Sequence, residues 1–106
     1  SELHVGSTAL RLGQNTGASL VDLDDRTTQV KLTQGALSVR VRALPPDQVV
    51  EIDTPNLAFT PQAPGEYRLD VAPDGSSTTV TVWRGNGTAY GDDRSVPLSA
   101  GQQILG

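Results

Sequence analysis

The chain has 106 residues, of which 36% are hydrophobic and 4% aromatic, and it carries a formal net charge of −4. This length predicts one domain around one core, and the acidic balance argues against nucleic acid as a partner, because nucleic-acid-binding surfaces concentrate Lys and Arg. No stretch approaches the roughly 20 apolar residues of a membrane-spanning helix, so we expect no membrane insertion by this segment. The absence of cysteine excludes disulfides and thiolate metal sites.

Alternation of apolar and polar residues, which is typical of half-buried strands, recurs along the chain. It is plainest in Leu37–Val41, where three apolar side chains point one way and the polar ones the other. Helical spacing is interrupted everywhere by Gly, Pro or Asp-rich segments, so we expect essentially no helix. The predicted strands lie, in chain order, near residues 10–12, 21–23, 30–32, 37–41, 50–53, 67–71, 79–83 and 96–98.

The connections are short and rich in turn-forming residues, so neighbouring strands should pair mostly antiparallel as hairpins. Hairpin turns are expected at 24–27, 72–75 and 84–87, and corners or edges at the prolines 45, 46, 61 and 64. Four further bends are expected at glycines that follow β-like runs, namely Gly13, Gly35, Gly85 and Gly101. The prediction is a single all-β domain over residues 1–106, formed by short strands as an irregular β-solenoid or rolled β-sandwich.

Several segments resemble a known family. Residues 10–16, 21–24 and 30–41 look like the opening of a FecR domain, and residues 50–59 resemble its extended segment ending in Thr-Pro-Asn, here Thr54-Pro55-Asn56. The following Gly-Thr-Glu-Phe-like step reads Pro64-Gly65-Glu66-Tyr67, without the Thr. Residues 79–85 and 96–103 look like the closing strands.

The resemblance implies an all-β, solenoid-like domain of the cell envelope, usually periplasmic, that binds another protein. The residues themselves lead us to expect no catalytic activity and no cofactor. Some relatives are anti-sigma regulators of iron-siderophore signalling, and others are exported proteins without an assigned role. The chain begins at Ser1 without an initiator Met. We therefore expect it to be part of a longer exported or membrane-anchored protein.

Candidate catalytic and metal-binding residues are few. His4 is the only histidine, so a Ser-His-Asp triad or proton relay would have to depend on a residue near the terminus. The acidic clusters Asp22, Asp24, Asp25 and Asp92, Asp93 suggest calcium, but neither has the spacing of a calcium loop, and Asp residues at hairpin tips usually accept backbone hydrogen bonds. The sequence therefore predicts no catalytic residue and no metal site.

Trp83 is the strongest candidate for an interaction residue. It falls in phase with Thr79 and Thr81, opposite Val80 and Val82, so its indole should be partly exposed unless another layer covers that face. Tyr90 could lie across the same hairpin and complete a recognition patch. Asn86-Gly87 is interpreted as the hairpin turn rather than as part of a glycosylation sequon.

Arg40, Arg42 and Arg68 should project from the polar strand faces. Cross-strand pairing with acids such as Glu51 or Asp70 is the ordinary explanation for them.

Three functions remain open from the sequence. The first is a periplasmic protein-interaction or sensory module, because unpaired strand edges or loop faces can accept a partner protein of unknown identity. The second is a carbohydrate- or cell-wall-binding domain, with Trp83 and Tyr90 stacking on sugar rings. The third is a structural spacer. The sequence does not determine the oligomeric state.

Overall fold

The computed structural model describes residues 2–5, 8–22, 26–44, 47–91 and 93–106, which form eleven β-strands and their connections. No helix occurs among these residues, so the prediction of an all-β chain is confirmed. The strands are β1 (Glu2–Val5), β2 (Thr8–Leu12), β3 (Gly17–Asp22), β4 (Thr27–Val41), β5 (Val49–Asp53), β6 (Ala58–Pro61), β7 (Gly65–Val71), β8 (Thr78–Arg84), β9 (Asn86–Gly91), β10 (Arg94–Ser99) and β11 (Gln103–Leu105).

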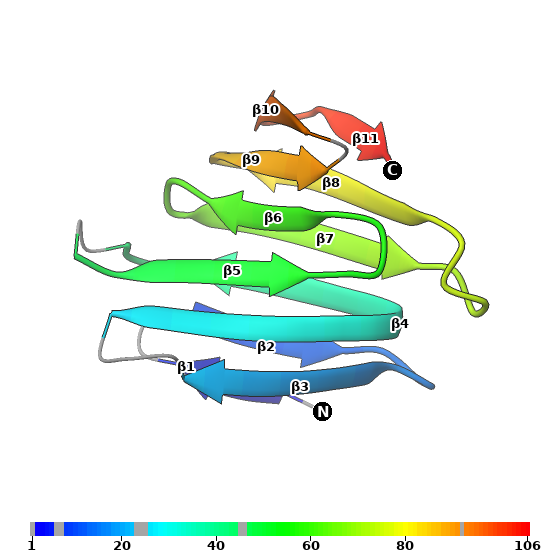
Figure 1. Cartoon of the computed structure of the whole chain (residues 1–106). Coiled ribbons are helices and arrows are strands. Elements are labelled where there is room, and N and C mark those ends of the chain that lie inside the picture. Colours follow the sequence, from blue (N-terminus) through cyan, green and yellow to red (C-terminus); the bar gives the residue numbers. More distant parts are fainter. Residues whose placement is uncertain (1, 6–7, 23–25, 45–46, 92) are drawn as a thin grey trace.

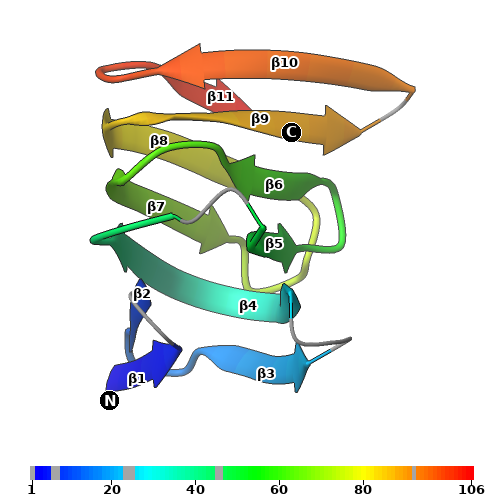
Figure 2. The same ribbon diagram turned by 90° about the vertical axis from the view of Figure 1, so that its left-hand side faces the viewer.

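All eleven strands belong to one sheet whose two limbs share β4 (Figure 1). The first half of β4 pairs with β3 and β5, and its second half pairs with β2 and β7. Limb A consists of β1, β2, the second half of β4, β7, β8 and β11. Limb B consists of β3, the first half of β4, β5, β6, β9 and β10. The two limbs face each other across the molecule (Figure 2).

The strand pairing is mostly antiparallel, as predicted, and among the described strands only β4 and β5 pair in parallel. The sheet curls through β4 into a nearly closed, barrel-like form of mixed strands. The finer expectation of a solenoid or rolled sandwich is not confirmed, because successive coils of a solenoid would stack in parallel. The turn expected at 24–27 includes Asp24 and Asp25, which lie outside the described residues, but the flanking β3 and β4 do pair antiparallel.

Gly35 is the residue at which β4 passes from one limb to the other. Its φ of +92° is a left-handed conformation that suits glycine. A Cβ at this position would lie 2.6 Å from Thr16 Cα, so Thr16 packs directly against the crossing. The Thr16 hydroxyl also donates to Ala36 O at 3.1 Å and accepts from Ala36 N at 3.2 Å. The crossing is therefore fixed both by sterics and by hydrogen bonds.

The core lies between the limbs and follows the predicted alternation. On β4, Leu37, Val39 and Val41 are buried, whereas Arg40 is exposed. Phe59 of limb B meets Tyr67 of limb A across the core, with ring centroids 5.4 Å apart and the rings tilted by 54°. Aromatic pairs of this geometry add about 0.5–1.5 kcal/mol beyond area burial.

Polar side chains also tie the limbs together at the Thr-Pro-Asn segment. The Thr54 hydroxyl accepts from Leu57 N at 3.1 Å and thereby caps the β5–β6 turn of limb B. The hydroxyl of Thr78, a fully buried residue of limb A, lies 2.9 Å from Thr54 Oγ1 and donates to Asn56 Oδ1 at 2.7 Å. Each buried polar side-chain atom of this network has a hydrogen-bond partner. The network therefore joins the β5–β6 hairpin of limb B to the β7–β8 hairpin of limb A.

We predict that Gly35→Ala destabilises the fold by about 2–5 kcal/mol, because it adds left-handed strain to a backbone clash with Thr16. Gly101→Ala is the matched control, since Gly101 has a φ of +87° but nothing within 4 Å of its Cβ position. It should lose only about 1–2 kcal/mol. Urea unfolding of both variants measures the difference. Equal losses would show that Thr16 does not fix the crossing.

Candidate functional site

Trp83 lies on the outer face of limb A, as its phase predicted, and is 59% exposed. The ladder between β7 and β8 shifts register here, with Tyr67 opposite Val82 but Glu66 opposite Arg84. Trp83 is the extra residue of this bulge, and both it and Arg84 are exposed. No other layer formed by the described residues covers this face.

Tyr90 is also exposed, at 43%, but it lies on limb B. β8 and β9 belong to different limbs and do not pair, so the expected hairpin at 84–87 is wrong. Gly85, with a φ of +86°, carries the chain across from limb A to limb B, and Asn86 begins the next strand. Trp83 and Tyr90 therefore occupy separate surfaces and do not form one patch, although an interaction role for each stays a prediction.

A shallow hollow of about 310 Å³ lies beside Trp83 on the outer face of limb A. We call it the arginine groove. Four arginines, one acid, two aromatic residues and three small or aliphatic residues line it: Arg11, Arg40, Arg42, Arg68, Glu66, Tyr67, Trp83, Ala9, Ser38 and Val39.

Strand register explains why this face is hollow. One cross-strand row runs Arg11, Ser38, Arg68, and the next runs Ala9, Arg40, Glu66. Short side chains thus alternate with long ones on neighbouring strands, which stand about 4.8 Å apart. The short residues form a floor and the arginines form the walls.

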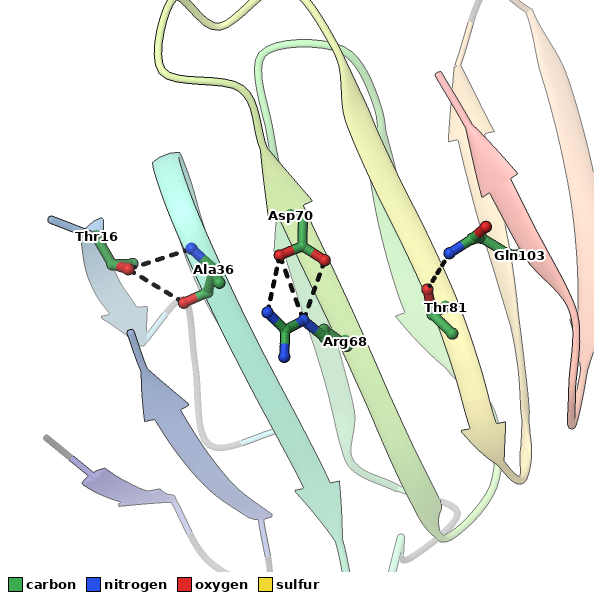
Figure 3. Close-up of polar contacts among 6 residues, drawn as sticks. All are labelled: Thr16, Ala36, Arg68, Asp70, Thr81 and Gln103. Atoms are coloured by element: carbon green, nitrogen blue, oxygen red, sulfur yellow. Dashed lines mark hydrogen bonds and ion pairs between the residues drawn. The ribbon is translucent and has the colours of Figure 1, made fainter. Parts of the chain in front are cut away.

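Two of the groove arginines, Arg68 and Arg40, form ion pairs with neighbouring acids. Arg68 donates from Nε and Nη2 to the Asp70 carboxylate at 3.1–3.3 Å (Figure 3). Arg40 Nε lies 3.7 Å from Glu66 Oε1, a looser contact between exposed groups. Asp70 does pair with an arginine, but the prediction of cross-strand pairing is wrong for it, because Arg68 and Asp70 both lie on β7. Glu51 lies on limb B and does not pair with these arginines.

Tyr67 anchors the end of the groove nearest Trp83. Its ring is buried, and its hydroxyl lies 2.6 Å from Ala63 O and 2.9 Å from Asn86 O. These bonds join the β6–β7 connection to the start of β9, next to the Trp83 bulge. Burial raises the pKa of the Tyr67 hydroxyl above its ordinary value of 10.0.

The outer face of limb B is chemically different. It carries Glu51 and Asp53, whose carboxylate accepts a hydrogen bond from the Gln29 amide. Burial, and then the neighbouring Asp53 charge, raise the pKa of Glu51. The two outer faces therefore differ in charge.

The other sequence candidates contribute no assembled site. Asp24, Asp25 and Asp92 lie outside the described residues, and the structure does not describe the side chains of His4 and Asp22. Within the described ranges, no group of three or more His, Cys, Asp or Glu is placed to hold a metal. That same part of the chain contains no helix long and apolar enough to cross a bilayer.

Solved structures share this fold. Two crystal structures of a "putative anti-sigma factor" from Parabacteroides distasonis ATCC 8503 superpose with a TM-score of 0.79 at 14% and 13% identity. Each match covers 99% of this chain and 49% of the other, so this chain spans about half the length of those proteins. At this identity the likeness shows the fold alone. Among curated proteins, none matches the sequence.

The sequence also matches a family. The model of the family described as FecR protein matches residues 3–86, which include all of the arginine groove. The chain belongs to this family, and the resemblance inferred from its motifs is confirmed. Tyr90 lies beyond the matched residues, whereas Trp83 lies within them.

We predict that Tyr67→Phe alters the pH dependence of stability. The pKa of Tyr67 is higher in the folded state than in the unfolded state, where it is about 10. The contribution of the protonated Tyr67 to the free energy of unfolding is therefore complete below the unfolded-state pKa and is lost as pH rises through the folded-state pKa. The free energy of unfolding should thus fall less steeply above pH 10 in Tyr67→Phe than in the wild type. Near pH 7 the variant should lose about 1 kcal/mol from the missing hydrogen bond. Urea titrations at pH 7 to 11 test both effects.

The control for this experiment is Tyr90→Phe, which removes an exposed hydroxyl instead. It should retain the wild-type slope. An alkaline slope unchanged in Tyr67→Phe would contradict the assignment to Tyr67.

Proposed function

We propose that this FecR domain is a non-catalytic, periplasmic protein-interaction or sensory module within a cell-envelope signalling protein. The support comes from its family, from the resemblance of its motifs to envelope regulators, and from its fold, which it shares with structures described as a putative anti-sigma factor. The surface observation that carries the proposal is the exposed Trp83 beside the arginine groove.

The position of Trp83 is suited to recognition of a partner. An exposed indole offers a large apolar contact area, and tryptophan and arginine are enriched among the residues that dominate binding energy at interfaces. The bulge, the Gly85 crossing and the Tyr67 hydroxyl hold the backbone around the indole. A fixed backbone lowers the entropic cost of docking a partner.

The chemistry of the groove favours binding over catalysis. Its dominant groups are guanidiniums, which stay protonated at physiological pH and so neither accept nor release protons. They present hydrogen-bond donors in a fixed planar geometry, as recognition of anionic groups requires.

We expect the immobilised wild-type domain to capture one specific protein from an envelope extract, and Trp83→Ala to weaken this capture by about 30-fold or more, the effect of losing an aromatic hot spot. Tyr90→Ala on limb B is the matched control and should capture normally. Loss of capture with Tyr90→Ala but not with Trp83→Ala would place the recognition face on limb B. Glycan retention on an array without protein capture would favour the carbohydrate-binding function, and no retention at all would favour the spacer.

We also expect the domain to face the periplasm. Because the chain lacks cysteine, Ser95→Cys on the exposed surface of β10 provides a unique thiol, provided that any cysteine elsewhere in the full-length protein is replaced. A membrane-impermeant maleimide should label it in cells whose outer membrane alone is permeabilised. Labelling that requires lysis of the inner membrane would contradict a periplasmic location.

A further inference from the structure

We infer that the arginine groove binds an extended acidic segment of the partner protein, with carboxylates on the arginines and an apolar side chain against Trp83. This inference rests on the proposed function and specifies the chemistry of its partner. It follows from the charge distribution, the spacing of the arginines and the unused donors of Arg40, Arg42 and Arg68.

The charge of the groove is opposite to that of the chain. The net charge is −4, with eight Lys and Arg residues in total, yet four of these line the groove and only one acid lines it with them. Glu51 and Asp53 lie on the other limb. A segment rich in Asp or Glu is therefore attracted more strongly to the outer face of limb A than to that of limb B, where Lys31, the Cα partner of Asp53, offsets one of the two acids.

Three of the four groove arginines, Arg40, Arg42 and Arg68, keep donors available for a ligand. Arg68 uses Nε and Nη2 for Asp70, and Figure 3 shows its remaining terminal nitrogen directed away from that carboxylate. Arg42 forms no ion pair within the described residues, and Arg40 has only its contact with Glu66 at 3.7 Å. Asp70 thus orients the guanidinium of Arg68, while those of Arg40 and Arg42 can donate to a ligand carboxylate in the bidentate geometry that arginine favours.

The spacing fits an extended chain lying across the strands. Arg11 and Arg68 are two strands apart in one row, or about 10 Å, with the short Ser38 between them. An extended peptide in the polyproline II conformation advances about 9 Å in three residues and returns every third side chain to the same face. Acidic residues at every third position would therefore reach successive arginines, and a side chain near the end of the groove would meet Trp83.

Arginine also binds phosphate, so nucleic acid is the competing ligand class. Its continuous charge would be repelled by the net charge of −4 over the rest of the surface, whereas a short acidic peptide is confined to the groove. We therefore commit to the peptide, and the experiment includes an oligonucleotide.

The test uses Trp83 as the reporter, because it is the only tryptophan of the chain. The probe is a decapeptide without Trp or Tyr that has Glu at every third position and one Leu, and its matched control has Gln in place of each Glu. The Glu peptide should change the Trp83 emission and lose about tenfold in affinity between 50 and 200 mM salt. The Gln peptide should bind at least tenfold more weakly.

Protein variants locate the binding. Arg40→Gln with Arg42→Gln should weaken Glu-peptide binding by about tenfold or more. Lys31→Gln with Arg94→Gln removes the same charge from limb B and should leave binding unchanged. Glu66→Gln, which removes the one acid of the groove, should tighten binding by about twofold to fivefold, an effect that misfolding cannot produce.

Three results would overturn the inference. They are equal binding of the Glu and Gln peptides, wild-type affinity in Arg40→Gln with Arg42→Gln, and tighter binding of an oligothymidylate of equal charge than of the Glu peptide. The capture experiment distinguishes failure of the acidic-segment inference from failure of the proposed protein-interaction function. A partner captured equally by wild type and the double arginine variant, but lost with Trp83→Ala, would leave the interaction module standing and refute the acidic segment.

Discussion

The architecture depends on the passage of β4 between the two limbs at Gly35. This strand provides the pairing surface for β3 and β5 on one side of the crossing and for β2 and β7 on the other. An L-residue at a φ of +92° would be strained, and the Thr16 backbone leaves no room for a Cβ. Thr16 then uses its hydroxyl to bind both polar backbone groups of Ala36 (Figure 3). Sterics and hydrogen bonding thus select the same conformation at the point where β4 passes between the limbs.

Side-chain hydroxyls tie the limbs together farther along the chain. Tyr67 joins the β6–β7 connection to the beginning of β9, and Thr78 reaches Thr54 and Asn56 across the two hairpins. Such bonds add only about 1 kcal/mol each, but they are directional in a way that apolar contacts are not. They position the bulge that exposes Trp83, because Tyr67 is the residue opposite Val82 where the register shifts. The surface proposed for recognition is therefore supported from within the core.

Much of the fold was predictable from local patterns. Alternation identified the strands that contribute most of the core, and Gly35, Gly85 and Gly101 were correctly expected at bends, since all three have positive φ. β6 and β9 escaped notice, because β6 ends in Pro61 and β9 contains Asn86-Gly87, which is typical of a turn. The exposure of Trp83 followed from its phase. Its separation from Tyr90 did not, because a short glycine connection is compatible with a hairpin or with a passage to the other limb.

The sequence by itself determined the all-β class, the family and the strand face on which Trp83 lies, because alternation, motif order and phase are properties of neighbouring residues. Only the tertiary structure decided that Arg11 of β2, Arg40 of β4 and Arg68 of β7 line one groove beside Trp83, together with Arg42 just after β4. Arg11 and Arg68 are far apart in the chain, and each alone resembles an ordinary exposed charge. Their proximity depends on the register of β2 and β7 against β4, which is set by non-local backbone hydrogen bonds and by burial of the opposite face.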